Sequence, residues 1–126
     1  MTITAAQEDT DQLGHVNNIT YLRWVQEIAI AHWNALAPAE DIEKLLWVVL
    51  RHEIDYKAQA FAGDVLTVRT WVGAAGRLKF ERNTEILRGG KLLAKALTVW
   101  CPIDRATGRP TAPGEIVRAL FSNANG

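Results

Sequence analysis

The periodicity of hydrophobic residues changes once along this chain, and that change constrains its fold more than any other feature. In residues 18–36 the apolar positions recur at the spacing of an amphipathic helix. From Leu46 onward they alternate with a period of two, which is typical of β-strands. Asn17 or Asn18 can cap the helix start, and Pro38 ends the helix. The sequence therefore predicts one long helix followed by strands.

Turn residues divide the second part of the chain into short strands. Gly89-Gly90 is a tight-hairpin signal, and Gly73 to Gly76 is expected to form another turn. Connections this short imply antiparallel pairing, so we expect a meander of about four strands covered by the one long helix. The predicted strands cover residues 2–8, 51–57, 65–72, 79–88 and 92–103, with short helices over 39–45 and 114–120.

One stripe of the long helix is expected to face the sheet. The apolar residues that recur at helical spacing on it are Ile19, Leu22, Val25, Ala29, Trp33 and Leu36. A chain of 126 residues, 48% of them hydrophobic, can form one core, so we predict a single α+β domain over residues 1–126.

Composition narrows the classes of function. Lys plus Arg and Asp plus Glu both number 14, so the net charge is zero, which argues against a nucleic-acid binder. No apolar run reaches membrane-spanning length, and the N-terminus does not resemble a signal peptide. The single cysteine, Cys101, excludes an intramolecular disulfide and favours a reducing compartment, so a cytoplasmic protein is expected.

Several catalytic mechanisms lack the residues they need. Ser122 is the only serine and lies near the C-terminus, which makes a Ser-His-Asp triad improbable. Cys101 lies in an apolar strand, as a buried inert thiol would. His15, His32 and His52 lack metal-ligand spacing, so neither a metal site nor a cofactor is predicted.

Asp11 is the strongest candidate for a catalytic residue. It precedes the start of the long helix, where unpaired backbone N–H groups and a partial positive charge can polarise a carbonyl. A carboxylate at that place can act as a general base or a nucleophile, although aspartates before helices are also common as capping residues. Gly14 permits close approach of a ligand to the backbone.

The role of His15 stays open between two interpretations. Its ring can hold Asp11 or the substrate, or it can pack on Tyr21 or Trp24. The basic residues Arg77, Lys79, Arg88 and Lys91 flank the predicted hairpins, where they can bind phosphates or simply solvate turns.

The stretch Asp11-Gln-Leu-Gly14-His15-Val-Asn17-Asn18-Ile-Thr-Tyr21 closely resembles the Asp-x-x-Gly-His-Val-Asn-Asn-x-x-Tyr signature of hotdog-fold acyl thioesterases. It is most similar to the 4-hydroxybenzoyl-CoA thioesterase group. Weaker similarity continues through Arg51–Tyr56, Phe61–Asp64, Val99-Trp100 and Thr107–Pro110.

This resemblance implies a hotdog fold of about five strands wrapped on the helix, and the hydrolysis of an acyl-CoA. It also implies a homodimer, or a dimer of dimers, with active sites at the subunit interface. Asp11 matches the catalytic carboxylate, and Asn18 matches the position whose backbone N–H polarises the thioester, with His15 beside them. The substrate would contact Gly14, Val16, Asn17 and Tyr21, and coenzyme A phosphates would meet Arg77, Arg88 and Lys91.

Two other functions suit the same fold. A non-catalytic module can bind acyl thioesters as a sensor or carrier without needing Asp11. A dehydratase ranks last, because no second carboxylate or histidine is suitably placed.

Overall fold

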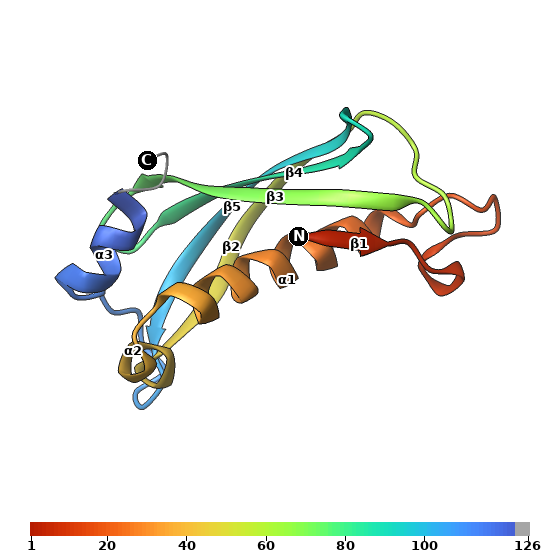
Figure 1. Cartoon of the computed structure of the whole chain (residues 1–126). Coiled ribbons are helices and arrows are strands. Elements are labelled where there is room, and N and C mark those ends of the chain that lie inside the picture. Colours follow the sequence, from red (N-terminus) through yellow and green to blue (C-terminus); the bar gives the residue numbers. More distant parts are fainter. Residues whose placement is uncertain (123–126) are drawn as a thin grey trace.

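A five-stranded antiparallel sheet packs on one long helix, α1, in the computed structural model, which describes residues 1–122 (Figure 1). This arrangement confirms the predicted α+β class. None of the helices in residues 1–122 is both long enough and apolar enough to span a membrane. The elements in chain order are β1 (Thr2–Thr4), the 3-10 helix η1 (Gln7–Asp9), α1 (Asn18–Leu36), α2 (Ala39–Lys44), β2 (Leu45–Tyr56), β3 (Val65–Ala75), β4 (Phe80–Arg88), β5 (Lys91–Asp104) and α3 (Glu115–Ser122).

The order of strands in the sheet is β1-β3-β4-β5-β2. β3, β4 and β5 form the predicted meander, but the prediction was wrong for β2, which pairs with β5 at the far edge instead of with β3. The register places Val48 opposite Cys101 and His52 opposite Thr98. β5 is apolar on both faces, and its place between β4 and β2 satisfies its backbone groups on both sides.

Glycines form the predicted β4–β5 hairpin turn, and another glycine, Gly73, allows close packing between β3 and β4 that the sequence did not reveal. Gly89 and Gly90 have φ angles of 55° and 85° and close the β4–β5 hairpin. The turn expected at residues 73–76 is wrong, because β3 continues to Ala75 and the chain turns between Gly76 and Lys79. A Cβ on Gly73 would lie 3.2 Å from the side chain of Asn83, so this glycine serves close packing against β4.

The helix α1 has the predicted bounds, but its buried face differs from the predicted stripe. Ile19 and Leu36 are 74% and 51% exposed. The sheet contacts a row rotated from the expected one, because the burial follows an i, i+3, i+4, i+7 pattern that begins at residue 21. The buried residues of α1 are Thr20, Tyr21, Trp24, Val25, Ile28 and Ala29.

Two apolar clusters fill the space beneath the sheet. The first joins the early turns of α1 to the sheet, with Trp24 and Ile28 against Leu66 and Leu93. The second lies at the other end, where α3 covers the sheet and buries Phe121. Cys101 is buried, as expected from its apolar strand. Because the clusters hold both ends of α1, the helix start has a fixed position on the sheet.

The buried face of α1 can be tested with two isoleucines. We expect Ile28→Ala to lower the free energy of unfolding by about 2–5 kcal/mol, because it opens a cavity under the sheet. Ile19→Ala, on the exposed face, should change it by less than about 0.5 kcal/mol. Urea denaturation measures both values, and equal losses would contradict the helix orientation.

Candidate active site

The loop between η1 and α1 closes on itself as a small hairpin. Thr10 and Val16 form a β-bridge. Beyond the bridge, the Asp11 N–H donates to the His15 carbonyl at 2.8 Å, and the Gly14 N–H donates to the Asp11 carbonyl at 3.1 Å. Gly14 has a φ of 79°, in the left-handed region that side chains disfavour. The backbone of this loop therefore holds Asp11 in one place.

The two oxygens of the Asp11 carboxylate have different surroundings. Oδ1 accepts hydrogen bonds from the backbone N–H groups of Leu13 at 2.9 Å and His15 at 3.1 Å. Oδ2 accepts none from any residue in the described part of the chain, and the side chain is exposed. The capping and catalytic interpretations are therefore compatible, because one oxygen orients the carboxylate while the other stays available.

Asn17, and not Asn18, caps helix α1. The Asn17 side chain accepts a hydrogen bond from the Ile19 N–H at 3.2 Å. Asn18 is the first helical residue, and among residues 1–122 no group accepts a hydrogen bond from its backbone N–H. The Tyr56 hydroxyl donates to the Asn18 carbonyl at 3.2 Å and so ties this turn to the end of β2. An unpaired donor thus sits at the positive end of the helix.

Asp9 anchors the site, and the sequence analysis missed it. Its side chain is buried, with Oδ2 accepting from the Ala6 N–H and Oδ1 from Arg23 Nη2, both at 2.9 Å. Its carbonyl accepts from the Asn17 N–H at 2.8 Å, which joins η1 to the helix cap. No periodicity distinguishes Asp9. The only signal was its charge, opposite to that of Arg23 on the next element.

The His15 ring packs edge-on against Phe61, with 5.2 Å between ring centroids. The expected contact with Tyr21 or Trp24 is therefore wrong. Tyr21 instead packs against Trp24 and Tyr56. The contact of His15 with Asp11 is made by its backbone N–H, and the ring makes no hydrogen bond to a described residue.

The predicted substrate contacts divide into exposed and buried groups. Asn17 is exposed and Gly14 is half-exposed at the surface of the loop. Val16 and Tyr21 are both only 2% exposed, so in this chain they support the loop from beneath. Burial raises the pKa of Tyr21, which keeps its hydroxyl protonated.

The three basic residues predicted to meet phosphates do not gather at one place in a single chain. Arg88 lies at the β4–β5 hairpin, where it donates to Asp64 Oδ2 at 2.7 Å and to the Gln59 carbonyl at 3.1 Å. Lys91 is opposite Arg88 and exposed. Arg77 lies at the β3–β4 turn, the opposite end of β3 from Asp64.

Within residues 1–122, no three His, Cys, Asp or Glu side chains are grouped so that they could hold a metal ion. The site just described consists of a carboxylate, a helix start and a supporting aromatic layer.

Residues 6–120 match the sequence profile of the thioesterase-like superfamily. The chain belongs to this superfamily. It is 29% identical over 110 residues to a chloroplastic palmitoyl-acyl carrier protein thioesterase of Gossypium hirsutum, a match that covers 79% of this chain. Over 78 residues it is 31% identical to a protein of the same description from Arabidopsis thaliana, covering 60% of this chain. The matches cover 27% and 19% of these two relatives.

Solved structures confirm the hotdog fold. A predicted thioesterase from Bacillus stearothermophilus superposes with a TM-score of 0.86 at 26% identity, covering 98% of this chain and 93% of that one. A Thermus thermophilus thioesterase complexed with coenzyme A and zinc gives 0.85 at 26% identity, covering 96% and 89%. A 1,4-dihydroxy-2-naphthoyl-CoA thioesterase from Synechocystis, at 21% identity and a TM-score of 0.82 over 98% and 94% of the chains, supports the fold alone.

The ion pair between Asp64 and Arg88 should make the free energy of unfolding depend on pH. Hydrogen bonds from the Phe61 N–H and Arg88 lower the pKa of Asp64. A carboxylate with a lowered pKa stabilises the fold above its unfolded-state pKa of about 4, and this contribution is lost as the pH falls through the folded value. We expect wild type to exceed Asp64→Asn in stability at neutral pH, with the difference shrinking in acid.

Urea denaturation across this pH range measures the effect, with Arg88→Met and the double variant completing a cycle. A difference between wild type and Asp64→Asn that stays constant from neutral to acidic pH would contradict this assignment.

Proposed function

We propose that this protein hydrolyses an acyl-CoA thioester, with Asp11 as general base or nucleophile and the Asn18 N–H as the donor that polarises the thioester carbonyl. One observation carries the proposal. Among residues 1–122, the hairpin before α1 presents a carboxylate oxygen without a partner, and the helix start that follows presents a backbone donor without an acceptor. Thioester hydrolysis needs both groups on the same carbonyl.

The reaction follows from these two groups. In the general-base form, Asp11 Oδ2 takes a proton from water, and the water oxygen bonds to the carbonyl carbon. The Asn18 N–H stabilises the negative charge that develops on the carbonyl oxygen. The tetrahedral intermediate then expels the thiolate of coenzyme A and leaves the free acid. In the nucleophilic form, Oδ2 itself bonds to the carbon, the thiolate leaves, and water hydrolyses the resulting anhydride.

Coenzyme A is the carrier we favour over acyl carrier protein. The similar Thermus thermophilus structure holds coenzyme A. The relatives that act on acyl carrier protein are much longer, and this chain spans about a quarter of the Gossypium hirsutum protein. Lys91 is exposed on the β4–β5 hairpin and pairs with no carboxylate in the described part of the chain, so it can meet a phosphate, whereas Asp64 already neutralises Arg88. Arg77 could contribute only from another subunit.

The assembly that we propose is a homodimer paired through β2. This strand lies at the sheet edge and runs for 12 residues, with Leu46, Val48 and Leu50 at least 40% exposed. A long apolar edge strand is a template for pairing with another chain. A second copy of β2, antiparallel to the first, would cover it.

The catalytic assignment is tested by Asp11→Asn. Asparagine keeps an oxygen that can cap the loop but cannot accept the proton, so we expect thiol release from acyl-CoAs to fall about a hundredfold or more, with unchanged circular dichroism. Glu40→Gln, which changes an exposed carboxylate on α2, is the control and should retain activity. Near-normal turnover of Asp11→Asn would refute the assignment. Binding of acyl-CoA by wild type without thiol release would favour a sensor or carrier.

The dimer is tested by placing charge on the β2 edge. We expect Val48→Glu combined with Leu50→Glu to give monomers in sedimentation velocity, because like charges would face each other across the paired strands. Val65→Glu changes a residue that is 59% exposed near β1 and should leave the dimer intact. A wild-type monomer at micromolar concentration would contradict the proposal.

A further inference from the structure

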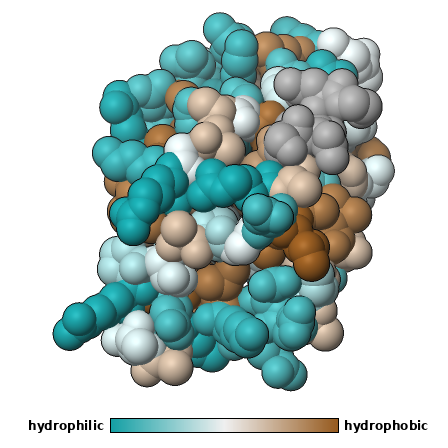
Figure 2. Space-filling view, turned by 90° about the vertical axis from the view of Figure 1, so that its left-hand side faces the viewer, coloured by the Kyte–Doolittle hydropathy of each residue, from teal (hydrophilic) through white to brown (hydrophobic). Residues whose placement is uncertain are grey.

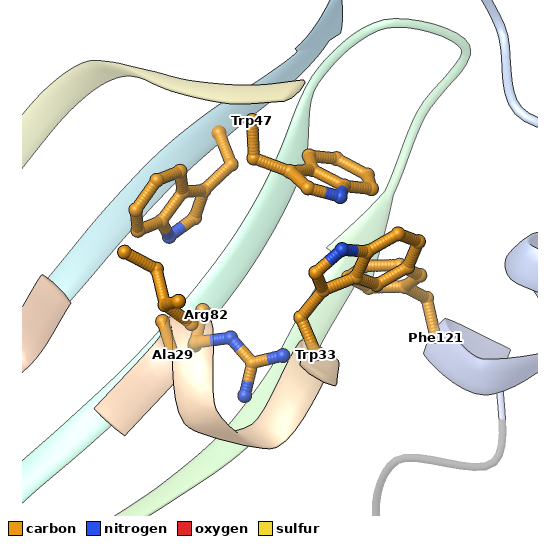
Figure 3. Close-up of a pocket in the computed structure, with 7 residues that line it drawn as sticks. Ala29, Trp33, Trp47, Arg82 and Phe121 are labelled. Atoms are coloured by element: carbon orange, nitrogen blue, oxygen red, sulfur yellow. The ribbon is translucent and has the colours of Figure 1, made fainter. Parts of the chain in front are cut away.

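A cavity lies at the opposite end of α1 from the Asp11 loop. It is a partly open space of about 40 Å³, enough for several water molecules, between the last turns of α1, the sheet and α3. Figure 3 shows Trp47 on one side and Trp33 and Phe121 on the other, with Arg82 beneath them. We call this space the tryptophan pocket and define it by Trp33, Trp47, Arg82, Trp100 and Phe121.

The tryptophan pocket contains hydrogen-bond donors that have no acceptor. The indole nitrogens of Trp47 and Trp100 are buried, and neither has a hydrogen-bond partner in the described structure. Trp100 is only 7% exposed. A buried indole N–H normally finds a partner, and leaving one unpaired costs about 1–3 kcal/mol. Two such groups on the wall of one pocket point to an acceptor that enters it.

Arg82 adds a positive charge to this set of donors. Its side chain comes from β4 and the residue is 6% exposed, yet no carboxylate pairs with it among residues 1–122. Nη1 contacts His32 Nδ1 at 3.0 Å and Thr70 Oγ1 at 3.3 Å, while Nε and Nη2 bond to no described residue. Buried charges are normally paired.

The groups around Arg82 supply no negative charge and so favour the binding of an anion. Burial lowers the pKa of Arg82 to about 10. Burial, and then the charge of Arg82, lower the pKa of His32, so the imidazole is neutral at neutral pH and can accept the Arg82 hydrogen bond without supplying negative charge. A planar guanidinium whose Nε and Nη2 make no hydrogen bond to a described residue matches a carboxylate better than it matches a neutral oxygen.

The pocket is too far from Asn18 to serve the same subunit. Trp33 follows Asn18 by fifteen residues of helix, or about 22 Å. Across the proposed dimer the distance is much shorter, because antiparallel pairing of β2 with its copy sets the beginning of one strand against the end of the other. Trp47 is near the beginning of β2 and Tyr56 is at its end, and both rings contact α1. Tyr56 also bonds to Asn18.

The surface at the end of the molecule that carries the tryptophan pocket is partly hydrophobic. Figure 2 views the end that carries α2 and α3, where hydrophobic residues reach the surface between hydrophilic ones. The cavity is partly open, and Ile30 on its lining is 49% exposed, so a ligand larger than the cavity can extend beyond it.

We propose that the tryptophan pocket of one subunit receives the acyl group bound at Asn18 of its partner, and that this group has a short apolar or aromatic body ending in a carboxylate. The substrate class is thus the mono-thioester of a dicarboxylic acid. Arg82 and the two indole N–H groups bind the carboxylate, and the rings of Trp33 and Phe121 hold the body. This inference rests on the proposed hydrolysis, but binding of a free acid to the pocket does not.

The first experiment measures binding without hydrolysis. Benzoate and benzyl alcohol are titrated into the 126-residue protein by calorimetry. We expect benzoate to bind more tightly than benzyl alcohol, and Arg82→Met to weaken benzoate about tenfold or more while changing benzyl alcohol little. Arg69→Met, which removes an exposed arginine paired with Glu85, is the matched control and should bind as wild type.

A second variant guards against misfolding of Arg82→Met. Trp47→Phe keeps the aromatic wall and removes one N–H, and we expect it to weaken benzoate several-fold but not benzyl alcohol. Equal affinities for benzoate in wild type, Trp47→Phe and a folded Arg82→Met would overturn the anion site. Binding of benzoate in wild type no tighter than that of benzyl alcohol would overturn it as well.

The second experiment separates the pocket from the hydrolysis. The kcat/KM values of 4-carboxybenzoyl-CoA and 4-methylbenzoyl-CoA are compared, and we expect wild type to prefer the carboxylate and Arg82→Met to lose about tenfold or more of that preference. Hydrolysis of both with a preference that ignores Arg82 would overturn this inference and leave the proposed function standing. No hydrolysis of either, with Arg82-dependent binding of benzoate, would overturn the proposed function and leave the anion site.

Discussion

The structure depends on the packing of one long helix against the inner face of a five-stranded sheet, with α3 covering one end of that face. α1 has 19 residues, or about 28 Å, and is the longest helix of the described chain. Its buried row, centred on Trp24 and Val25, must lie over the sheet, because no other element can exclude water from Leu66 and Leu93. Once that row packs on the sheet, both ends of α1 have fixed positions. The proposed catalytic site lies at one end and the tryptophan pocket at the other.

At the N-terminal end of α1, packing of the helix on the sheet fixes the position of its first backbone N–H groups. Asp9 ties η1 to the cap at Asn17 and to Arg23, so the hairpin that carries Asp11 cannot move independently of α1. Among residues 1–122 the Asn18 N–H has no acceptor, which is usual at a helix start. At the other end, the same helix contributes Trp33 to a pocket in which the indole N–H groups of Trp47 and Trp100 have no partner among the described residues.

The predictions failed where the structure depends on contacts between segments that are distant in the sequence. The helix bounds, the Gly89-Gly90 hairpin and the apolar central strand follow from local spacing, and all were confirmed. The pairing of β2 with β5 was missed, because strand order is a long-range choice that alternation within a strand does not encode. One of the two interpretations of His15 placed its ring on Tyr21 or Trp24, but the ring contacts Phe61, which follows it by 46 residues and reaches it only through the folded sheet.

The sequence by itself determined the α+β class and the bounds of α1, because the change of hydrophobic period and the signals that begin and end a helix are local features of the chain. The tertiary structure decided which face of α1 is buried, which oxygen of Asp11 is used as a cap, and that Asp9 is an anchor. It also decided that Arg82 lies buried without a carboxylate partner among residues 1–122, because its hydrogen-bond partners come from α1 and β3, which only the folded chain brings to β4. Burial and pairing are properties of such assembled neighbourhoods, and no local pattern records them.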